Sequence, residues 1–200
     1  NSAKPLGTQP IQPGDLKYAD LNNDGIIDNN DRTALGRPNL PNLTLGLPIN
    51  LSYRGFSVNI LFQGSLNYSL ALGSTAIEPF QTQIQAIHQQ RWTPQTASSA
   101  MFPRLSTYNN TANSPGNFLS DFYLINAQYL RLKTVEFRYQ FPSKLLPFKI
   151  NNLAAYLSGY NLATWTNYSL YQQDPEVTSN TAGDAYQNQR VINFGVQIGL

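Results

Sequence analysis

Residues 20–31 have side-chain types and a spacing that suit calcium binding. Oxygen-bearing groups recur along this twelve-residue stretch: Asp20, Asn22, Asp24, the carbonyl of Ile26, Asp28 and Asp31. They fall at positions one, three, five, seven, nine and twelve of a calcium loop, and Gly25 supplies the sharp turn at position six. Because calcium takes six to eight oxygen ligands, the sequence predicts a structural calcium site that pins this segment.

An alternative reading of the same stretch needs no ion. Asp31 stands where the EF-hand pattern has a glutamate, its shorter arm favours weaker binding, and no flanking helix pair is evident. The stretch would then be a solvated turn held by hydrogen bonds from Asp and Asn side chains. A dockerin requires a second such loop, which the sequence does not contain.

The other polar residues predict no enzyme. His88 is the only histidine, and it is expected to be a surface or packing residue. The chain has no cysteine, which excludes thiolate nucleophiles and disulfides. No paired acid and base can be placed, and Asp174-Pro175-Glu176 is expected to form a loop turn.

An aromatic group follows the predicted fourth strand: Tyr160, Trp165, Tyr168 and Tyr171. Two interpretations apply. These rings could stack on a sugar substrate, or they could form an aromatic girdle or pack within a loop.

The elements that must position these residues are β-strands. Alternation of apolar and polar residues with period two predicts five strands, at residues 43–53, 56–63, 128–141, 152–160 and 189–200. Arg54-Gly55 predicts a tight turn between the first two strands. The alternation slips near Lys133, which predicts a bulge. Strict alternation places Glu136 and Arg138 on one face of this strand and Arg131 and Lys133 on the other.

Three long segments separate or precede these strands, at residues 1–42, 64–127 and 161–188. Glu78 to Trp92 shows near-helical spacing of apolar residues, which predicts one short helix within the second segment. Such long loops would be unusual inside a compact soluble domain but are normal on the outer side of a membrane barrel.

Composition favours a transmembrane β-barrel. Charged residues make up 12% of the chain, against about 25% in ordinary globular domains. No apolar run approaches the roughly 20 residues of a membrane-spanning helix. The net charge of +2 without a basic run does not indicate nucleic-acid binding. Because about five strands cannot close a barrel, the chain is expected to be the carboxyl-terminal part of a larger one.

The competing fold is a soluble, secreted β-sandwich that binds carbohydrate and contains structural calcium. The two folds differ in what covers the apolar face of the strands. A sandwich would bury Phe56, Val58, Phe194 and Val196 beneath a second layer of polypeptide, whereas a barrel would leave them facing lipid.

Four ordered sequence blocks resemble the SusC/RagA-type TonB-linked outer-membrane transporters. They are Gly14-Asp15-Leu16-Lys17-Tyr18-Ala19-Asp20 running into the acidic loop and Gly36; Arg91-Trp92-Thr93-Pro94 with Pro103-Arg104-Leu105; Tyr129-Leu130-Arg131-Leu132-Lys133 with Tyr139 and Pro142; and Ser158-Gly159-Tyr160-Asn161-Leu162 with Asp174-Pro175-Glu176. The resemblance covers nearly the whole chain, but only the carboxyl-terminal part of the family. The family usually ends in an aromatic residue, from which Leu200 departs.

The resemblance implies a function and a set of partners. It implies a barrel of about 22 strands with an internal plug, in the outer membrane of a Bacteroidota-type Gram-negative bacterium. It also implies TonB-driven import of glycan or peptide fragments beneath a SusD-like surface lipoprotein. The remaining strands, the plug that contacts TonB and the surrounding lipid or lipopolysaccharide would complete the assembly. The short turns would then face the periplasm, and the long loops would face the outside.

Overall fold

The computed structural model describes residues 4–5, 11–73, 77–80, 84–106, 112–116, 120–147, 150–167, 171, 173–177 and 186–199. The chain divides into two compact units. We call residues 41–67, 128–167 and 187–200 the sheet unit, and residues 1–40, 68–127 and 168–186 the loop unit.

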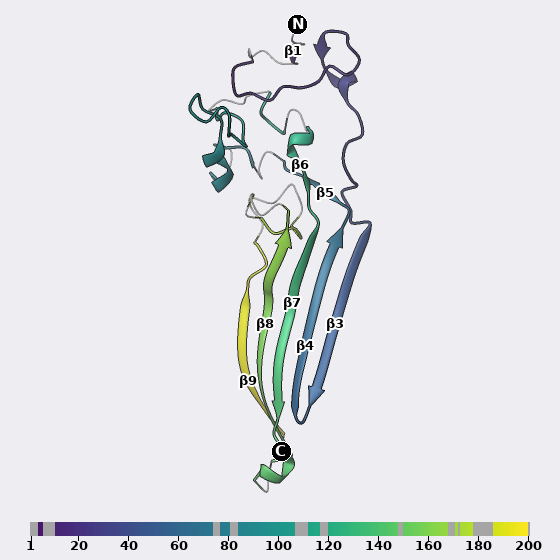
Figure 1. The fold of residues 1–200 in the computed structure, drawn as a ribbon, viewed down its shortest axis with the longest axis vertical. Coiled ribbons are helices and arrows are strands. Elements are labelled where there is room, and N and C mark those ends of the chain that lie inside the picture. Colours follow the sequence, from purple (N-terminus) through teal and green to yellow (C-terminus); the bar gives the residue numbers. More distant parts are fainter. Residues whose placement is uncertain are drawn as a thin grey trace. The chain divides into compact units, whose positions relative to one another are not determined.

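The sheet unit is one antiparallel sheet in the order β3-β4-β7-β8-β9 (Figure 1). Its strands are β3 (Leu43–Tyr53), β4 (Phe56–Leu66), β7 (Tyr129–Gln140), β8 (Asn152–Thr166) and β9 (Val191–Gly199). The five predicted strands are therefore confirmed. The predicted ends differ most at β8, which continues to Thr166 and does not stop at Tyr160.

A two-residue turn joins β3 to β4. Arg54 and Gly55 have φ angles of 47° and 86°, and positive φ at both central residues is what a type I′ hairpin requires. A Cβ on Gly55 would lie 2.7 Å from the carbonyl oxygen of Gln140. Glycine therefore serves both the turn and the close approach of β7.

The predicted bulge in β7 is confirmed. Because of it, Arg131 lies on the face of the sheet opposite to the predicted one. The pairing of β7 with both neighbours shifts between Leu132 and Thr134. Arg131 pairs with Gln63, and Glu136 pairs with Asn59, four residues away on β4. Residues four apart on one strand share a face. Arg131 thus lies on the same face as Glu136 and Arg138, because the extra residue reverses the alternation that placed it opposite.

The two faces of the sheet differ sharply in chemistry. Cross-strand pairs such as Tyr53–Phe56, Val58–Phe137 and Leu157–Phe194 make one face apolar. The relative exposures of Phe56, Phe194 and Val196 are 61%, 74% and 53%. No second sheet covers this face in the described part of the chain, so the structure does not favour the sandwich alternative.

The short connections and the long segments leave the sheet at opposite ends. The Arg54-Gly55 turn, the 141–151 connection with η4 (Ser143–Leu145) and the end of β9 lie together at one end (Figure 1). The chain enters the long 67–128 and 167–190 segments from the other end. No helix among the described residues is long and apolar enough to cross a membrane.

The loop unit contains short elements that the sequence did not predict. β5 (Ser69–Ala71) pairs antiparallel with β6 (Leu124–Asn126), and β1 (Lys4–Pro5) pairs parallel with β2 (Ile26–Ile27). Two 3₁₀ turns, η1 (Asn29–Asp31) and η3 (Asp121–Tyr123), complete these segments.

The predicted helix from Glu78 to Trp92 is wrong for the residues that the structure describes. They form only the 3₁₀ helix η2 (Ala86–Gln90). Phe80 has a φ of 69°, and Gln85 is extended with a ψ of 165°. Ile87 is buried while Ile84 is 65% exposed, so the apolar spacing does not define one buried helical face.

An apolar core of its own holds the loop unit together. Its buried members come from four separate stretches of chain: Leu72, Ile77, Ile87, Phe102, Tyr123 and Ile125. Burying such side chains contributes about 1.5–3 kcal/mol each. The loop unit is therefore an ordered, packed structure in the residues described.

Candidate functional site

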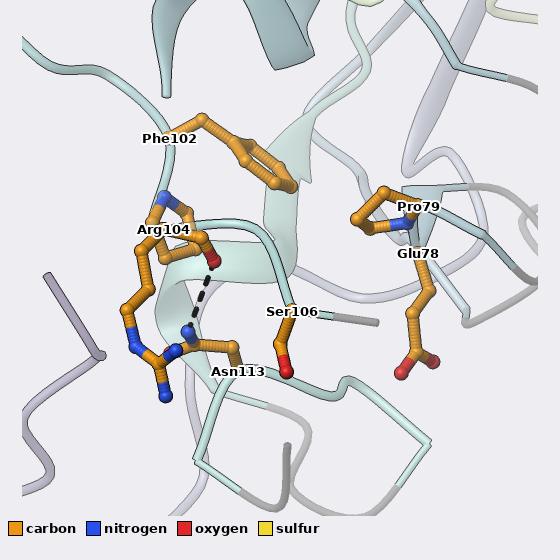
Figure 2. Close-up of a pocket in the computed structure, with 7 residues that line it drawn as sticks. Glu78, Pro79, Phe102, Arg104, Ser106 and Asn113 are labelled. Carbon is orange, nitrogen blue, oxygen red and sulfur yellow. Dashed lines mark hydrogen bonds between the residues drawn. The ribbon is translucent and has the colours of Figure 1, made fainter. Parts of the chain in front are cut away.

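A buried ion pair connects the amino-terminal part of the loop unit to the segment that follows Phe102. The Arg104 Nε donates to Asp15 Oδ1 over 2.6 Å, and Asn113 Nδ2 donates to the same oxygen over 2.8 Å. Asn113 Nδ2 also lies 3.4 Å from the carbonyl oxygen of Arg104 (Figure 2). The Asp15 side chain is 1% exposed, so this pair places a compensated charge inside the unit.

Gly14 allows this connection to form. The Arg104 N–H donates to the Gly14 carbonyl over 2.9 Å. Gly14 has a φ of 89°, and a Cβ there would lie 2.5 Å from the Trp92 ring. Only glycine permits both the left-handed backbone and the close contact with the indole.

Glu78 is a second buried carboxylate, and it borders a small cavity. The Ser114 hydroxyl donates to Glu78 Oε2 over 3.1 Å. The cavity of about 20 Å³ is lined by Glu78, Phe102, Arg104, Ser106 and Asn113, among others. Figure 2 shows Glu78 and the Arg104 guanidinium on opposite sides of it. The volume suits one ordered water molecule.

His88 is held through both ring nitrogens. The backbone N–H of Gln85 donates to Nδ1 over 2.9 Å, and Nε2 lies 2.8 Å from the Ile77 carbonyl oxygen. Since a carbonyl only accepts, Nε2 carries the proton and Nδ1 carries none. The His88 ring also meets Phe102 edge to face, with centroids 4.9 Å apart. The prediction of a packing residue is therefore correct, and the surface reading is not, since His88 is 1% exposed.

Burial determines the titration of several groups in the loop unit. It raises the pKa of the Tyr123 hydroxyl, with smaller contributions from Tyr18, Glu78 and Tyr171. It also raises the pKa of Tyr171. Burial lowers the pKa of His88, and the hydrogen bond to Ile77 offsets part of this effect. These tyrosines and His88 are thus neutral at pH 7.

The acidic loop is organised by its own backbone. The Gly25 N–H donates to Asp20 Oδ2, and the Ile26 N–H donates to Asp24 Oδ1, each over 2.8 Å. Asp31 accepts from the backbone of Leu21 and Asn22 at Oδ1 and of Asp28 at Oδ2. The hydrogen bond from Asp28 is the largest cause that lowers the Asp31 pKa. The loop therefore shows the hydrogen bonds expected of the turn interpretation.

One buried carboxylate oxygen of this loop has no hydrogen-bond partner among the described residues. Asp20 Oδ1 is buried, and among the described residues no donor lies within hydrogen-bonding distance of it. As the side chains are placed, no three acidic, histidine or cysteine residues of the described chain converge on a point that could hold a metal ion.

The acidic loop also forms one wall of a groove of about 750 Å³. Residues of the segment around η3 also line this groove. The groove is lined by Tyr18, Leu21, Ile27, Leu35, Asp121 and Phe122, among others.

Polar side chains form rows across the second face of the sheet unit. One row contains the pairs Asn50–Asn59, Asn59–Glu136, Glu136–Ser158 and Ser158–Asn193. Arg138 Nη2 donates to Gln197 Oε1 over 2.7 Å, and Arg131 Nε donates to Thr164 Oγ1 over 3.0 Å. The charges on this face are thus placed among amides and hydroxyls.

The structure gives the predicted aromatic residues different surroundings, each described within its own unit. Tyr160 pairs with Thr134 on the polar face, whereas Trp165 pairs with Leu130 on the apolar face. Tyr171 packs against the apolar core of the loop unit. Tyr168 lies outside the described residues. The position of Trp165 resembles that of a girdle residue more than that of a sugar-stacking residue.

Sequence reasoning missed the Asp15–Arg104–Asn113 network. In the sequence, Gly14-Asp15 and Pro103-Arg104 stand out only as parts of motif blocks, and Asn113 belongs to no motif. Arg104 and Asp15 are 89 positions apart, so no local spacing could pair them.

Comparison with known proteins adds relatives and structural neighbours. No protein-family model matches the chain. TonB-dependent receptor P26 of Formosa agariphila is 31% identical over 204 residues, covering 94% of this chain and 20% of that receptor. TonB-dependent receptor P3 of the same species is 30% identical over 215 residues, covering 97% of this chain and 20% of the receptor. The chain thus spans about one fifth of these curated relatives.

Solved structures share the fold. The RagAB peptide importer in its open-open state superposes with a TM-score of 0.65 at 21% identity, over 88% of this chain and 19% of that one. Its closed-closed state gives a TM-score of 0.64 at 20% identity, over 87% and 19%. Strand order, strand faces and sequence similarity agree: this chain belongs to the TonB-dependent receptors, and it forms antiparallel strands of an outer-membrane barrel together with their connecting segments.

Proposed function

We propose that this chain is part of a TonB-dependent outer-membrane importer in a Gram-negative bacterium. The observation that supports this proposal most directly is a sheet with one exposed apolar face and one polar face, in a chain 31% identical to a TonB-dependent receptor over 94% of its length. The apolar face would contact lipid, and the polar face would line the interior. The protein would carry out no covalent chemistry.

The location of the long segments supports an orientation. The short turns and the end of β9 share one end of the sheet, as expected for the periplasmic side of such barrels. The long segments, with the acidic loop and the ion-pair network, would then face the outside. Within the interior, Glu136 and Arg138 would be charged groups that the plug or a passing solute meets, whereas Arg131 is only 1% exposed and would support the polar face from within.

The proposed substrates and partners rest on the sequence resemblance to SusC/RagA-type transporters and on the similar RagAB structures. RagAB is a peptide importer, and the resemblance adds glycan fragments as a second substrate class. We propose a SusD-like surface lipoprotein over the outer mouth, with TonB acting through the plug. Of the four aromatic residues named from the sequence, Tyr160 is the candidate for contact with a sugar, because it lies on the polar face.

Uptake by cells tests the proposal. A strain lacking the full-length receptor should lose growth on one oligosaccharide or peptide source from a panel, and the intact gene should restore it. A tagged receptor should co-purify with a surface lipoprotein from detergent-solubilised outer membranes. Recovery of the full-length protein from the soluble fraction without detergent would rule the proposal out.

We also propose that the acidic loop binds one structural calcium ion, with Asp20 Oδ1 as the first ligand. In the full-length receptor, calcium should lower amide exchange across residues 20–31 relative to chelator, with a dissociation constant of about 0.1–1 mM. Asp20→Asn should abolish this response, because it replaces a charged carboxylate with a neutral amide that has only one oxygen. Asp174→Asn, in the other acidic turn, serves as the control. If the amide exchange of residues 20–31 is the same with calcium and with chelator, the calcium proposal is wrong and the stretch is an ion-free turn.

A further inference from the structure

His88 connects its own turn to two neighbouring segments of the loop unit, one at Ile77 and one at Phe102. Its Nε2 binds the Ile77 carbonyl, its Nδ1 binds the Gln85 N–H, and its ring packs on Phe102. Two residues after His88, the Gln90 carbonyl accepts hydrogen bonds from the backbone N–H groups of Met101 and Phe102. The imidazole thus joins residues 85–91 to the Ile77 segment through a hydrogen bond, and it adds ring packing to the backbone hydrogen bonds that hold them to the Phe102 segment.

Only the neutral imidazole with its proton on Nε2 satisfies both hydrogen bonds. A second proton would sit on Nδ1, which faces the Gln85 N–H at 2.9 Å. Two N–H groups cannot bond to one another, so the Gln85 donor would lose its acceptor. The imidazolium would also be a charge enclosed by Ile77, Ile87 and Phe102. Burial of such a charge is costly unless an anion pairs with it.

The charged and titratable groups around His88 offer little compensation. Arg91, on the same element, places Nη1 3.4 Å from the His88 carbonyl and adds positive charge. Glu78 adjoins Ile77 but accepts from Ser114. Arg104, from the Phe102 segment, is paired with Asp15. Tyr123 and Tyr171, from the other packed segments, stay neutral because burial raises the pKa of each.

We propose that His88 is an acid-sensitive latch that docks residues 85–91 onto the loop core when neutral and releases them when protonated. The direction of the pKa change determines whether docking strengthens or weakens as the pH falls. Burial lowers the pKa of folded His88, so the opened segment binds a proton more readily than the docked one. Docking is therefore complete above pH ~6.5, the ordinary histidine value, and it weakens as the pH falls toward the lowered pKa.

Amide hydrogen exchange in the full-length, detergent-solubilised receptor tests the latch. After correction for intrinsic exchange, the opening constant of peptides covering residues 85–91 should rise up to about tenfold per pH unit as the pH falls from 6.5. His88→Gln is neutral at all pH values and keeps a donor toward Ile77, so its profile should be flat. Glu78→Gln removes the nearest carboxylate and should keep the wild-type dependence.

Each result decides the proposal. A flat wild-type profile between pH 7.5 and pH 4.5 would overturn it, as would a His88→Gln profile parallel to that of the wild type. Loss of the dependence in Glu78→Gln alone would assign the proton to Glu78 and would also overturn it. If His88→Gln does not fold, His88→Asn replaces it, since its Oδ1 accepts in the position of Nδ1. If neither variant folds, the wild-type and Glu78→Gln profiles decide.

Discussion

Replacement of Arg104 by alanine is expected to destabilise the loop unit by about 3–5 kcal/mol. Asp15 is 1% exposed and the Arg104 side chain 21% exposed, so the variant leaves a buried carboxylate without its charged partner. The Asn113 amide, which also donates to Asp15 and accepts from the Leu16 N–H, would lose its fixed position. Limited proteolysis of the full-length receptor should show faster cleavage within residues 11–20 and 102–106.

Arg37→Ala is the matched control, because Arg37 is an exposed arginine of the same unit. A double-mutant cycle with Asp15→Asn isolates the pair. The double variant should be less destabilised than the sum of the two single variants, since neither charge is then left unpaired. If Arg104→Ala and Arg37→Ala are cleaved at the same rate, the ion pair does not stabilise this unit.

The second large effect is expected on the apolar face of β9. Phe194→Arg places a charge where Phe194 is 74% exposed and pairs with Leu157. If this face contacts lipid near the bilayer midplane, the substitution costs about 2–4 kcal/mol. The folded, heat-modifiable fraction of the full-length receptor in outer membranes should fall correspondingly.

Asn193→Arg is the control one residue away. Asn193 pairs with Ser158 in the polar row, so its side chain points to the opposite face and should tolerate a charge. Two equally harmful substitutions, or two harmless ones, would contradict the assignment of one face to lipid and the other to the interior.

Strands could be predicted from the sequence because their signals are local. The alternation in 43–53 and 56–63 and the Arg54-Gly55 turn lie within a few residues of one another, and each strand shows its faces by itself. The bulge near Lys133 was visible for the same reason. Its consequence for Arg131 was not, because the facing depends on the register with β4 and β8.

The predicted helix at 78–92 illustrates the opposite case. The apolar residues there have helical spacing, but they are used by tertiary packing. Ile77, Ile87 and His88 turn inward to a core built with Phe102 and Tyr123, and the backbone at Phe80 and Gln85 leaves the helical region to allow this. Packing against distant segments outweighed a weak local preference.

By itself, the sequence determined the five strands, their two-faced character, the tight turn and the acidic loop, since all depend on neighbours along the chain. The tertiary structure alone decided which distant side chains meet. Asp15 with Arg104, and Arg131 on the face of Glu136, follow from the path of the chain and the register of its strands. Such contacts link positions tens of residues apart, and no periodicity in the sequence records them.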